Sequence, residues 1–222
     1  IERGVKHPAI GDSKADLLEL LSALNHRQED WPAAIKTSTR FLEAYPEHVR
    51  AGEMRYTLGV AQSRSGRLKA ARMTFESLRE VSIARPDRLF YELAWVCRRA
   101  KDEPAAIAAF GRVATLSKDE DLTGESCLHV GEALLKDGKV ADGLTYLQKV
   151  AGKYEGRAQY LCGFTRFEAG KFGMARAHFE QIVAFGDTHA LYYEAQFFVG
   201  ETQYREEDYK GAVDRYAILI GR

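Results

Sequence analysis

A small residue recurs along this chain at intervals of 32 to 37 residues, and this period constrains the fold more than any other feature. The recurring positions are Ala34, Ala71, Ala106, Gly143, Ala175 and Ala212. Most are followed four residues later by a large apolar residue, at Phe75, Phe110, Leu147, Phe179 and Tyr216. Most are preceded twelve residues earlier by another small residue, at Gly59, Ala94, Gly131, Gly163 and Gly200. Such a period is typical of stacked helix pairs, each of which buries its apolar face against its neighbours.

One unit near the C-terminus illustrates the predicted pair of helices. Apolar residues at helical spacing predict a first helix over residues 157–169 and a second over 171–185. Gly170 ends the first helix, as a glycine just beyond a helix commonly does. Gly163 lies inside the first helix, where glycine costs about 1 kcal/mol relative to alanine. We therefore expect Gly163 and Ala175 to allow a close approach of the two helix backbones.

The repeated unit resembles the tetratricopeptide repeat, whose first helix carries an L-G pair and whose second helix carries A-x3-F. The L-G positions are Leu58-Gly59, Val130-Gly131, Cys162-Gly163 and Val199-Gly200. The A-x3-F positions are Ala71/Phe75, Ala106/Phe110, Ala175/Phe179 and Ala212/Tyr216. The signature tryptophan is absent, and the first unit departs most, with Ser22 and Ser38 in place of the small and large residues.

The resemblance implies an all-α fold, a right-handed α-solenoid of about six helix pairs. One array is expected over residues 1–222, with repeats at 15–48, 52–86, 87–120, 124–155, 156–187 and 193–222. The turn from Asp208 to Ala212 is also similar, more loosely, to that of bacterial envelope-assembly members of the family.

The charge balance and the hydropathy pattern exclude some classes of partner. The chain has 32 basic and 32 acidic residues, which argues against broad electrostatic binding to nucleic acid or anionic membranes. No apolar run is long enough to predict a membrane-spanning helix. The chain starts at Ile1 and stops at Arg222, at the end of a second helix. We expect the natural protein to continue past Arg222, or another chain to cover this end. The other chain can be a second copy, which would make this end a site of self-association. The sequence indicates no localisation.

No pattern of reactive side chains predicts catalysis, a metal or a cofactor. The three cysteines, Cys97, Cys127 and Cys162, fall on apolar helix positions without a C-x2-C pair, so buried thiols are expected. The six histidines are scattered, without metal-binding spacing. Glycine–lysine pairs such as Gly138-Lys139 lack the spacing and the Ser or Thr of a phosphate-binding loop. There is no G-x-S-x-G sequence. The chain is expected not to be an enzyme.

A partner-binding groove is the site that the resemblance implies. First helices of this family line a concave surface, and the inner positions carried onto this chain are rich in aromatic residues and arginine. The candidates are Tyr56, Arg64, Arg88, Tyr91, Trp95, Arg98, Arg99, Arg157, Tyr160, Phe167 and Tyr204. Exposed stripes of this composition are typical of binding sites. The alternative is that helix packing buries much of the stripe, with Phe164 and Phe197 as core residues.

The function expected from these features is a non-enzymatic scaffold for protein–protein interaction, which binds a protein or peptide segment in the groove. Because Asn25 is the only asparagine, a carboxylate-gripping pair of Asn and Lys is not expected, and an apolar or aromatic segment with acidic flanks is favoured. Two alternatives remain open. One is an oligomerisation or docking module of a larger enzyme or of a secretion or envelope machine. The other is a glycan-binding array of an export system.

Overall fold

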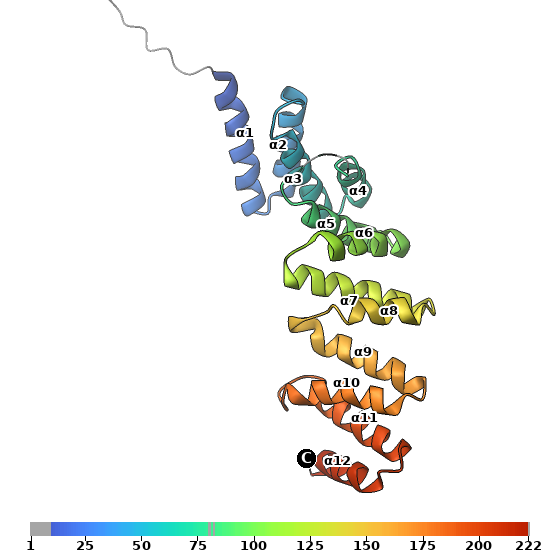
Figure 1. Cartoon of the computed structure of the whole chain (residues 1–222). Coiled ribbons are helices and arrows are strands. Elements are labelled where there is room, and N and C mark those ends of the chain that lie inside the picture. The colour runs from blue at the N-terminus through green and yellow to red at the C-terminus, as the bar shows by residue number, and fades with distance from the viewer. Residues whose placement is uncertain (1–9, 80, 82, 222) are drawn as a thin grey trace, which may run out of the picture. The chain divides into compact units, whose positions relative to one another are not determined.

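The structure is a computed structural model that describes residues 10–79, 81 and 83–221, with side chains from residue 14 onward. The described residues form twelve α-helices and one short 3-10 helix and contain no strand (Figure 1). The helices are α1 (Ile10–Arg27), α2 (Trp31–Ala44), α3 (Ala51–Arg64), α4 (Leu68–Glu76), α5 (Pro86–Arg99), α6 (Glu103–Leu116), α7 (Glu120–Lys136), α8 (Val140–Leu147), α9 (Glu155–Glu168), α10 (Phe172–Ala184), α11 (Tyr192–Arg205) and α12 (Tyr209–Ile220). The predicted all-α fold of helix pairs is confirmed.

Two compact units divide the chain, Ile1–Arg112 and Val113–Arg222, and each is described by itself. The first unit contains α1 to α5 and most of α6, and the second contains the rest of α6 and α7 to α12. Within each unit, helices that follow one another in sequence pack against one another, and α6 contacts α5 through the rings of Phe110 and Trp95. The single array over residues 1–222 and its right-handed superhelix stay predictions.

Glycine makes half of the turns between paired helices. Gly66, Gly138 and Gly170 have φ values of 81°, 75° and 69°, in the left-handed region that glycine adopts without a Cβ clash. Each is followed by an arginine or lysine that makes no side-chain cap to the second helix. These turns therefore rest on the conformational freedom of glycine, as the sequence predicted for Gly170.

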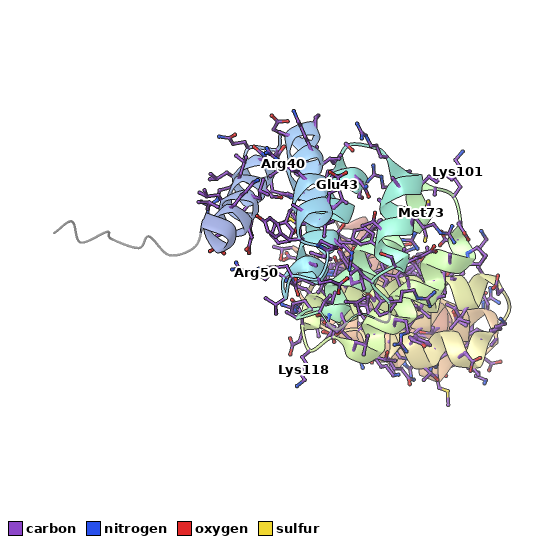
Figure 2. All side chains as sticks on the ribbon, turned by 90° about the horizontal axis from the view of Figure 1, so that it is seen from above. Arg40, Glu43, Arg50, Met73, Lys101 and Lys118 are labelled. Carbon is purple, nitrogen blue, oxygen red and sulfur yellow. The ribbon has the colours of Figure 1, made fainter. Side chains whose placement is uncertain are left out.

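The other three turns place a larger residue in the same left-handed conformation. Glu29, Lys101 and Glu207 have φ values of 56°, 61° and 63°, and Lys101 projects outward from the α5–α6 turn (Figure 2). An aspartate follows each one and accepts a backbone hydrogen bond from the start of the second helix: Asp30 from Ala33 (3.0 Å), Asp102 from Ala105 (3.2 Å) and Asp208 from Gly211 (3.0 Å). A cap of this kind contributes about 1 kcal/mol, which offsets the strain of a non-glycine residue there.

Within a pair, the small residue of the first helix makes room for the large residue of the second. A Cβ atom on Gly163 would lie 2.9 Å from the Phe179 ring, and one on Gly59 would lie 2.5 Å from the Phe75 ring. The Phe179 ring is thus what a side chain on Gly163 would meet first, and the close approach of Gly163 to Ala175 stays a prediction. A close backbone approach of this kind occurs in the α7–α8 pair, where a Cβ on Gly131 would lie 3.2 Å from the Gly143 carbonyl oxygen.

Between pairs, each second helix shares a core with the next first helix. Phe179 and Ile182 of α10, for example, form one buried cluster with Ala195 and Val199 of α11. The three cysteines belong to such apolar surroundings: all are buried and free, and burial raises the pKa of each thiol. The expectation of buried structural thiols is confirmed.

Candidate functional site

A pocket of about 400 Å³ lies across α1, α3 and α5 of the first unit, and we call it the α1–α3 pocket. Tyr56, one of the predicted site residues, lines it from α3 together with Thr57. His26 lines it from α1, with its Nε2 atom 3.0 Å from the Thr57 carbonyl oxygen. Burial and the nearby Glu92 raise the pKa of the half-buried Tyr56 to about 12, so its hydroxyl stays a neutral hydrogen-bond donor.

A second pocket, of about 280 Å³, lies between α3 and α5, and we call it the α3–α5 pocket. It is lined by Ser63, Arg64, Tyr91, Glu92, Trp95 and Arg99. Four of these six residues were predicted from the sequence. Glu92 lines both pockets, so the two hollows adjoin on the first helices of this unit.

The aromatic side of the α3–α5 pocket is held from behind by α6. The rings of Tyr91 and Trp95 meet edge to face, with centroids 6.3 Å apart, because a four-residue step places them on one face of α5. Both rings also pack edge-on against Phe110, at 6.3 Å and 5.7 Å. Phe110 is fully buried, whereas Tyr91 and Trp95 are half-buried. The pair therefore has a rigid support and keeps part of its surface toward the pocket.

Two of the predicted arginines belong to the pocket wall. Arg64 is exposed, and its guanidinium lies 3.7 Å from the Glu92 carboxylate. Arg99 donates hydrogen bonds to the backbone carbonyl (3.0 Å) and the hydroxyl (3.3 Å) of Ser63. Arg99 thus ties the end of α5 to α3, which the sequence did not predict.

The other two predicted arginines of this unit lie outside both pockets. Arg98 stacks over the rings of Trp95 and Phe110, at 5.4 Å and 5.0 Å, and pairs with Glu103 at 3.0 Å. It therefore lies toward α6 rather than toward α3. Arg88 is exposed and lines neither pocket. Neither Arg98 nor Arg88 therefore lines the two pockets.

Glu92 lines both pockets and is the most central of the site residues that the sequence reasoning missed. Burial raises the pKa of its carboxyl group, and Arg64, Arg88 and Arg99 partly counteract that effect. A signal was present in the sequence, because Glu92 is the only charged residue between Leu89 and Cys97. A lone carboxylate in an otherwise apolar stretch of helix is costly to bury without a role or a partner.

In the second unit, the aromatic residues at the positions equivalent to Tyr91 and Trp95 pack against other aromatic rings. Tyr160 stacks on Phe164, with centroids 6.1 Å apart and planes at 10°, and meets Phe198 edge-on at 5.9 Å. Its hydroxyl donates to the Glu194 carboxylate at 2.7 Å. Phe198 also stacks on the buried Phe179 at 4.8 Å. Tyr160 is therefore part of an aromatic cluster, the packing alternative that the sequence left open.

The remaining predicted residues of the second unit lie around this cluster. Phe167 meets the Phe198 ring edge-on at 5.5 Å, and Arg157 pairs with Glu132 at 3.2 Å. Tyr204 is exposed, and its ring contacts the ring of Tyr209 at the start of α12.

The two residues named as possible core in the second unit have different environments. Phe164 is half-buried within the aromatic cluster, as the packing alternative expected, whereas Phe197 is exposed.

Other kinds of site find little support in the described part of the chain. Among residues 10–79, 81 and 83–221, no group of three or more His, Cys, Asp or Glu side chains is placed to hold a metal ion. None of the described helices combines the length and the apolar character that crossing a membrane requires. Arg222, where self-association through an uncapped end was expected, lies outside the described residues.

Comparisons with known proteins agree with the helix-pair fold. The family model of the tetratricopeptide repeat matches residues 56–121, from α3 into α7. Among solved structures, YrrB, described as a TPR protein with an unusual peptide-binding site, is 21% identical over 85% of this chain and 95% of its own, with a TM-score of 0.61. MamA from Desulfovibrio magneticus is 18% identical over 77% and 94%, with a TM-score of 0.58. Pseudomonas aeruginosa PilF is 14% identical over 94% and 91%, with a TM-score of 0.57. No curated protein matched the sequence.

The helix pairs, the left-handed turns and the small-to-large packing within each pair define an all-α repeat protein. The family match identifies residues 56–121 as tetratricopeptide repeat sequence, and the likeness to the solved TPR structures shows that the chain has the same fold.

Proposed function

We propose that the protein is a non-enzymatic scaffold that binds a segment of a partner protein on the first unit, across the α1–α3 and α3–α5 pockets. The observation that carries the proposal is that the two pockets adjoin at Glu92 and present tyrosine, tryptophan and arginine side chains together. These residue types are enriched at the energetic centres of protein interfaces. The fold likeness to YrrB, whose description includes a peptide-binding site, is in accord with this function.

The chemistry of the pockets favours one kind of segment. Trp95 and Tyr91 offer an aromatic wall, which suits an apolar or aromatic side chain. Arg64 is exposed at the rim, which suits an acidic residue that flanks the apolar anchor. With a neutral chain overall, the attraction to such a segment is local, and nucleic acid is not a proposed partner.

The test is a binding screen of the purified chain against a display library of random peptides. We expect the selected peptides to share an aromatic or large apolar residue beside Asp or Glu. Trp95→Ala should weaken their binding about 30-fold, whereas Tyr209→Ala on α12, which removes an exposed aromatic ring far along the sequence, should leave it unchanged. Peptides that bind both variants equally would contradict the proposed site.

A glycan partner is the second candidate, because aromatic walls also stack on sugar rings. Titration of the chain with soluble oligosaccharides, followed by isothermal titration calorimetry, separates the two proposals. Saturable binding of an oligosaccharide that Trp95→Ala removes, with no peptide selected, would replace the peptide proposal by the glycan one.

A further inference from the structure

Helix α1 carries a stripe of leucines on a face that no described segment covers. Leu17, Leu20, Leu21 and Leu24 are 64%, 57%, 47% and 44% exposed, and their spacing places them on one side of the helix. The other side is the one that packs, with Leu18 buried against Phe41 and Met54. Soluble proteins seldom leave four adjacent leucines in water, so this face calls for a partner.

The repeat itself shows what kind of partner this face takes. Leu17 lies five residues before the small position of its helix, and the residues at that place in the other first helices are all buried: Met54, Leu89, Ser126, Ala158 and Ala195. In α11, Ala195 is buried in one cluster with Phe179 and Ile182 of the preceding α10. Met54 of α3 likewise packs with Phe41 of the preceding α2. The exposed face of α1 is therefore the face that receives the second helix of a preceding repeat.

The contact between a second helix and the next first helix is called the joint below. Helix α12 presents the second-helix half of such a joint. Leu219 lies seven residues after the small position Ala212, and the residues at that place in the other second helices are all buried: Phe41, Leu78, Val113, Val150 and Ile182. Leu219 itself is only partly buried, and next to it Ile220 is 84% exposed.

The position one residue after the small residue gives a second comparison. In α2, α6 and α8 it holds the half-buried apolar residues Ile35, Ile107 and Leu144. In α4 and α10 it holds Arg72 and Arg176, which form ion pairs with Asp102 and Glu206 just beyond the next first helix. At this place α12 carries Val213, which is 63% exposed. A valine side chain makes no hydrogen bond to water, so burying it in an apolar contact is favourable.

We propose that copies of this chain associate head to tail, with α12 of one copy packed on the leucine face of α1 of the next. This contact would continue the joint that α2–α3 and α10–α11 already make within the chain. It is heterologous, because the two surfaces differ, so it extends into open chains unless a ring closes. The contact is separate from the peptide surface and stands whether or not that surface binds a segment.

Sedimentation velocity on the purified chain over a wide concentration range tests the proposal. The mass should rise with concentration above that of one 24.9 kDa chain. Two blocked variants follow from the geometry: L17E/L24E removes the α1 half, and V213E/I220E removes the α12 half. Each alone should sediment as a single chain. An equimolar mixture should form a dimer of twice that mass and stop there, because one intact joint remains between the two variants.

Matched controls guard against a general effect of the added charge. Met73→Glu on α4 and Met174→Glu on α10 replace side chains that are 64% and 60% exposed, close to those of Leu17 and Val213. Both controls should associate as the unaltered chain does, and circular dichroism should show the same helix content in every variant.

Other occupants of the leucine face give different results. If V213E/I220E still self-associates while L17E/L24E does not, the contact is α1 on α1 and the proposal is overturned. If the unaltered chain remains monomeric at all concentrations, the α1 face does not bind a second copy, and the proposal is equally overturned.

Discussion

Tyr56 in the first unit and Tyr160 in the second occupy the same place in their repeats, three residues before the small residue of a first helix, yet their surroundings differ. The residue of the next first helix that lies beside Tyr56 is Glu92, and the one beside Tyr160 is Phe198. Phe198 fills the space with aromatic contacts, whereas Glu92 lines two pockets. One side chain from the neighbouring repeat thus separates a packed core from a candidate binding surface.

The comparison also shows that an aromatic residue at an inner position does not define a site. Trp95 and Phe164 are equivalent, one residue after the small position, and both are half-buried. Phe164 is covered by Phe198 of the next pair, with ring centroids 5.7 Å apart. Trp95 lines a pocket. We expect substitutions to separate these roles, with stability responding in the second unit and binding in the first.

The largest effect should come from a charge at the centre of the aromatic cluster in the second unit. Phe198→Glu removes five aromatic contacts and places a carboxylate against Phe179, and we expect it to lower the free energy of unfolding by about 4 kcal/mol. Phe197→Glu, at the exposed neighbouring position, is the matched control and should cost about 1 kcal/mol or less. Urea denaturation measures both. Equal losses would mean that the aromatic cluster is not a core.

On the pocket side, Trp95→Ala should act mainly on binding. We expect a selected peptide to bind about 30-fold more weakly, a loss of about 2 kcal/mol, as at other interfacial tryptophans. Isothermal titration calorimetry measures the change, with Tyr204→Ala in the second unit as the control that keeps full affinity. A variant that binds at full strength would place the site elsewhere.

Replacing Glu92 by an apolar residue makes its position more like that of Phe198 in the second unit. Glu92→Leu should raise the free energy of unfolding by about 1 kcal/mol, since it replaces a desolvated carboxylate by an apolar side chain. Burial is the larger cause of the raised pKa of Tyr56 and the Glu92 charge the second, so ultraviolet titration should find that pKa lowered from about 12 by part of the shift. An unchanged tyrosine titration would show that Glu92 does not face the Tyr56 hydroxyl.

The two units should respond to pH in opposite directions. Burial raises the pKa of Glu92 above its usual 4.5, so the stability it contributes is present at low pH and is lost as pH rises through its folded pKa. Burial and Arg166 lower the pKa of His178 from 6.5 to about 4, so stability is lost as pH falls from about 6.5 toward 4.

Thermal melts of Glu92→Gln and His178→Gln between pH 4 and 7 test this opposition. Glu92→Gln should no longer show the loss of stability as pH rises, and His178→Gln should no longer show the loss as pH falls. Each variant should keep the other trend. A histidine variant that keeps the unaltered loss of stability toward pH 4 would contradict the assignment to His178.

The smallest expected effect concerns the pocket rim. Arg64→Ala should weaken peptide binding by less than about 1 kcal/mol, and the effect should disappear in high salt because Arg64 is exposed. Arg99→Ala should behave differently, although Arg99 is exposed as well. Its hydrogen bonds to Ser63 hold α5 to α3, so part of its effect should persist in salt. Calorimetry at two ionic strengths distinguishes the two arginines.

Sequence reasoning succeeded where a local pattern has only one structural solution. A glycine such as Gly170 or Gly138 between two amphipathic stretches marks a turn because its left-handed conformation is readily available. The turns at Glu29, Lys101 and Glu207 carry no such mark. The aspartate that follows each one is visible in the sequence, but its capping role depends on a backbone conformation that the sequence does not show.

The chain's sequence by itself determined the helix pairs, their period and the small residues that seat large ones, because these depend on residues a few positions apart or on a pattern repeated six times. Tertiary structure alone decided which inner positions form pockets. Arg98 turned toward Phe110 and α6, and Arg99 toward Ser63, although both are adjacent on one helix. Glu92 and Phe198 meet their tyrosines only when one repeat packs on the next. The exposure of a side chain is set by neighbours that are distant in sequence, and their identity becomes decisive only after packing brings them together.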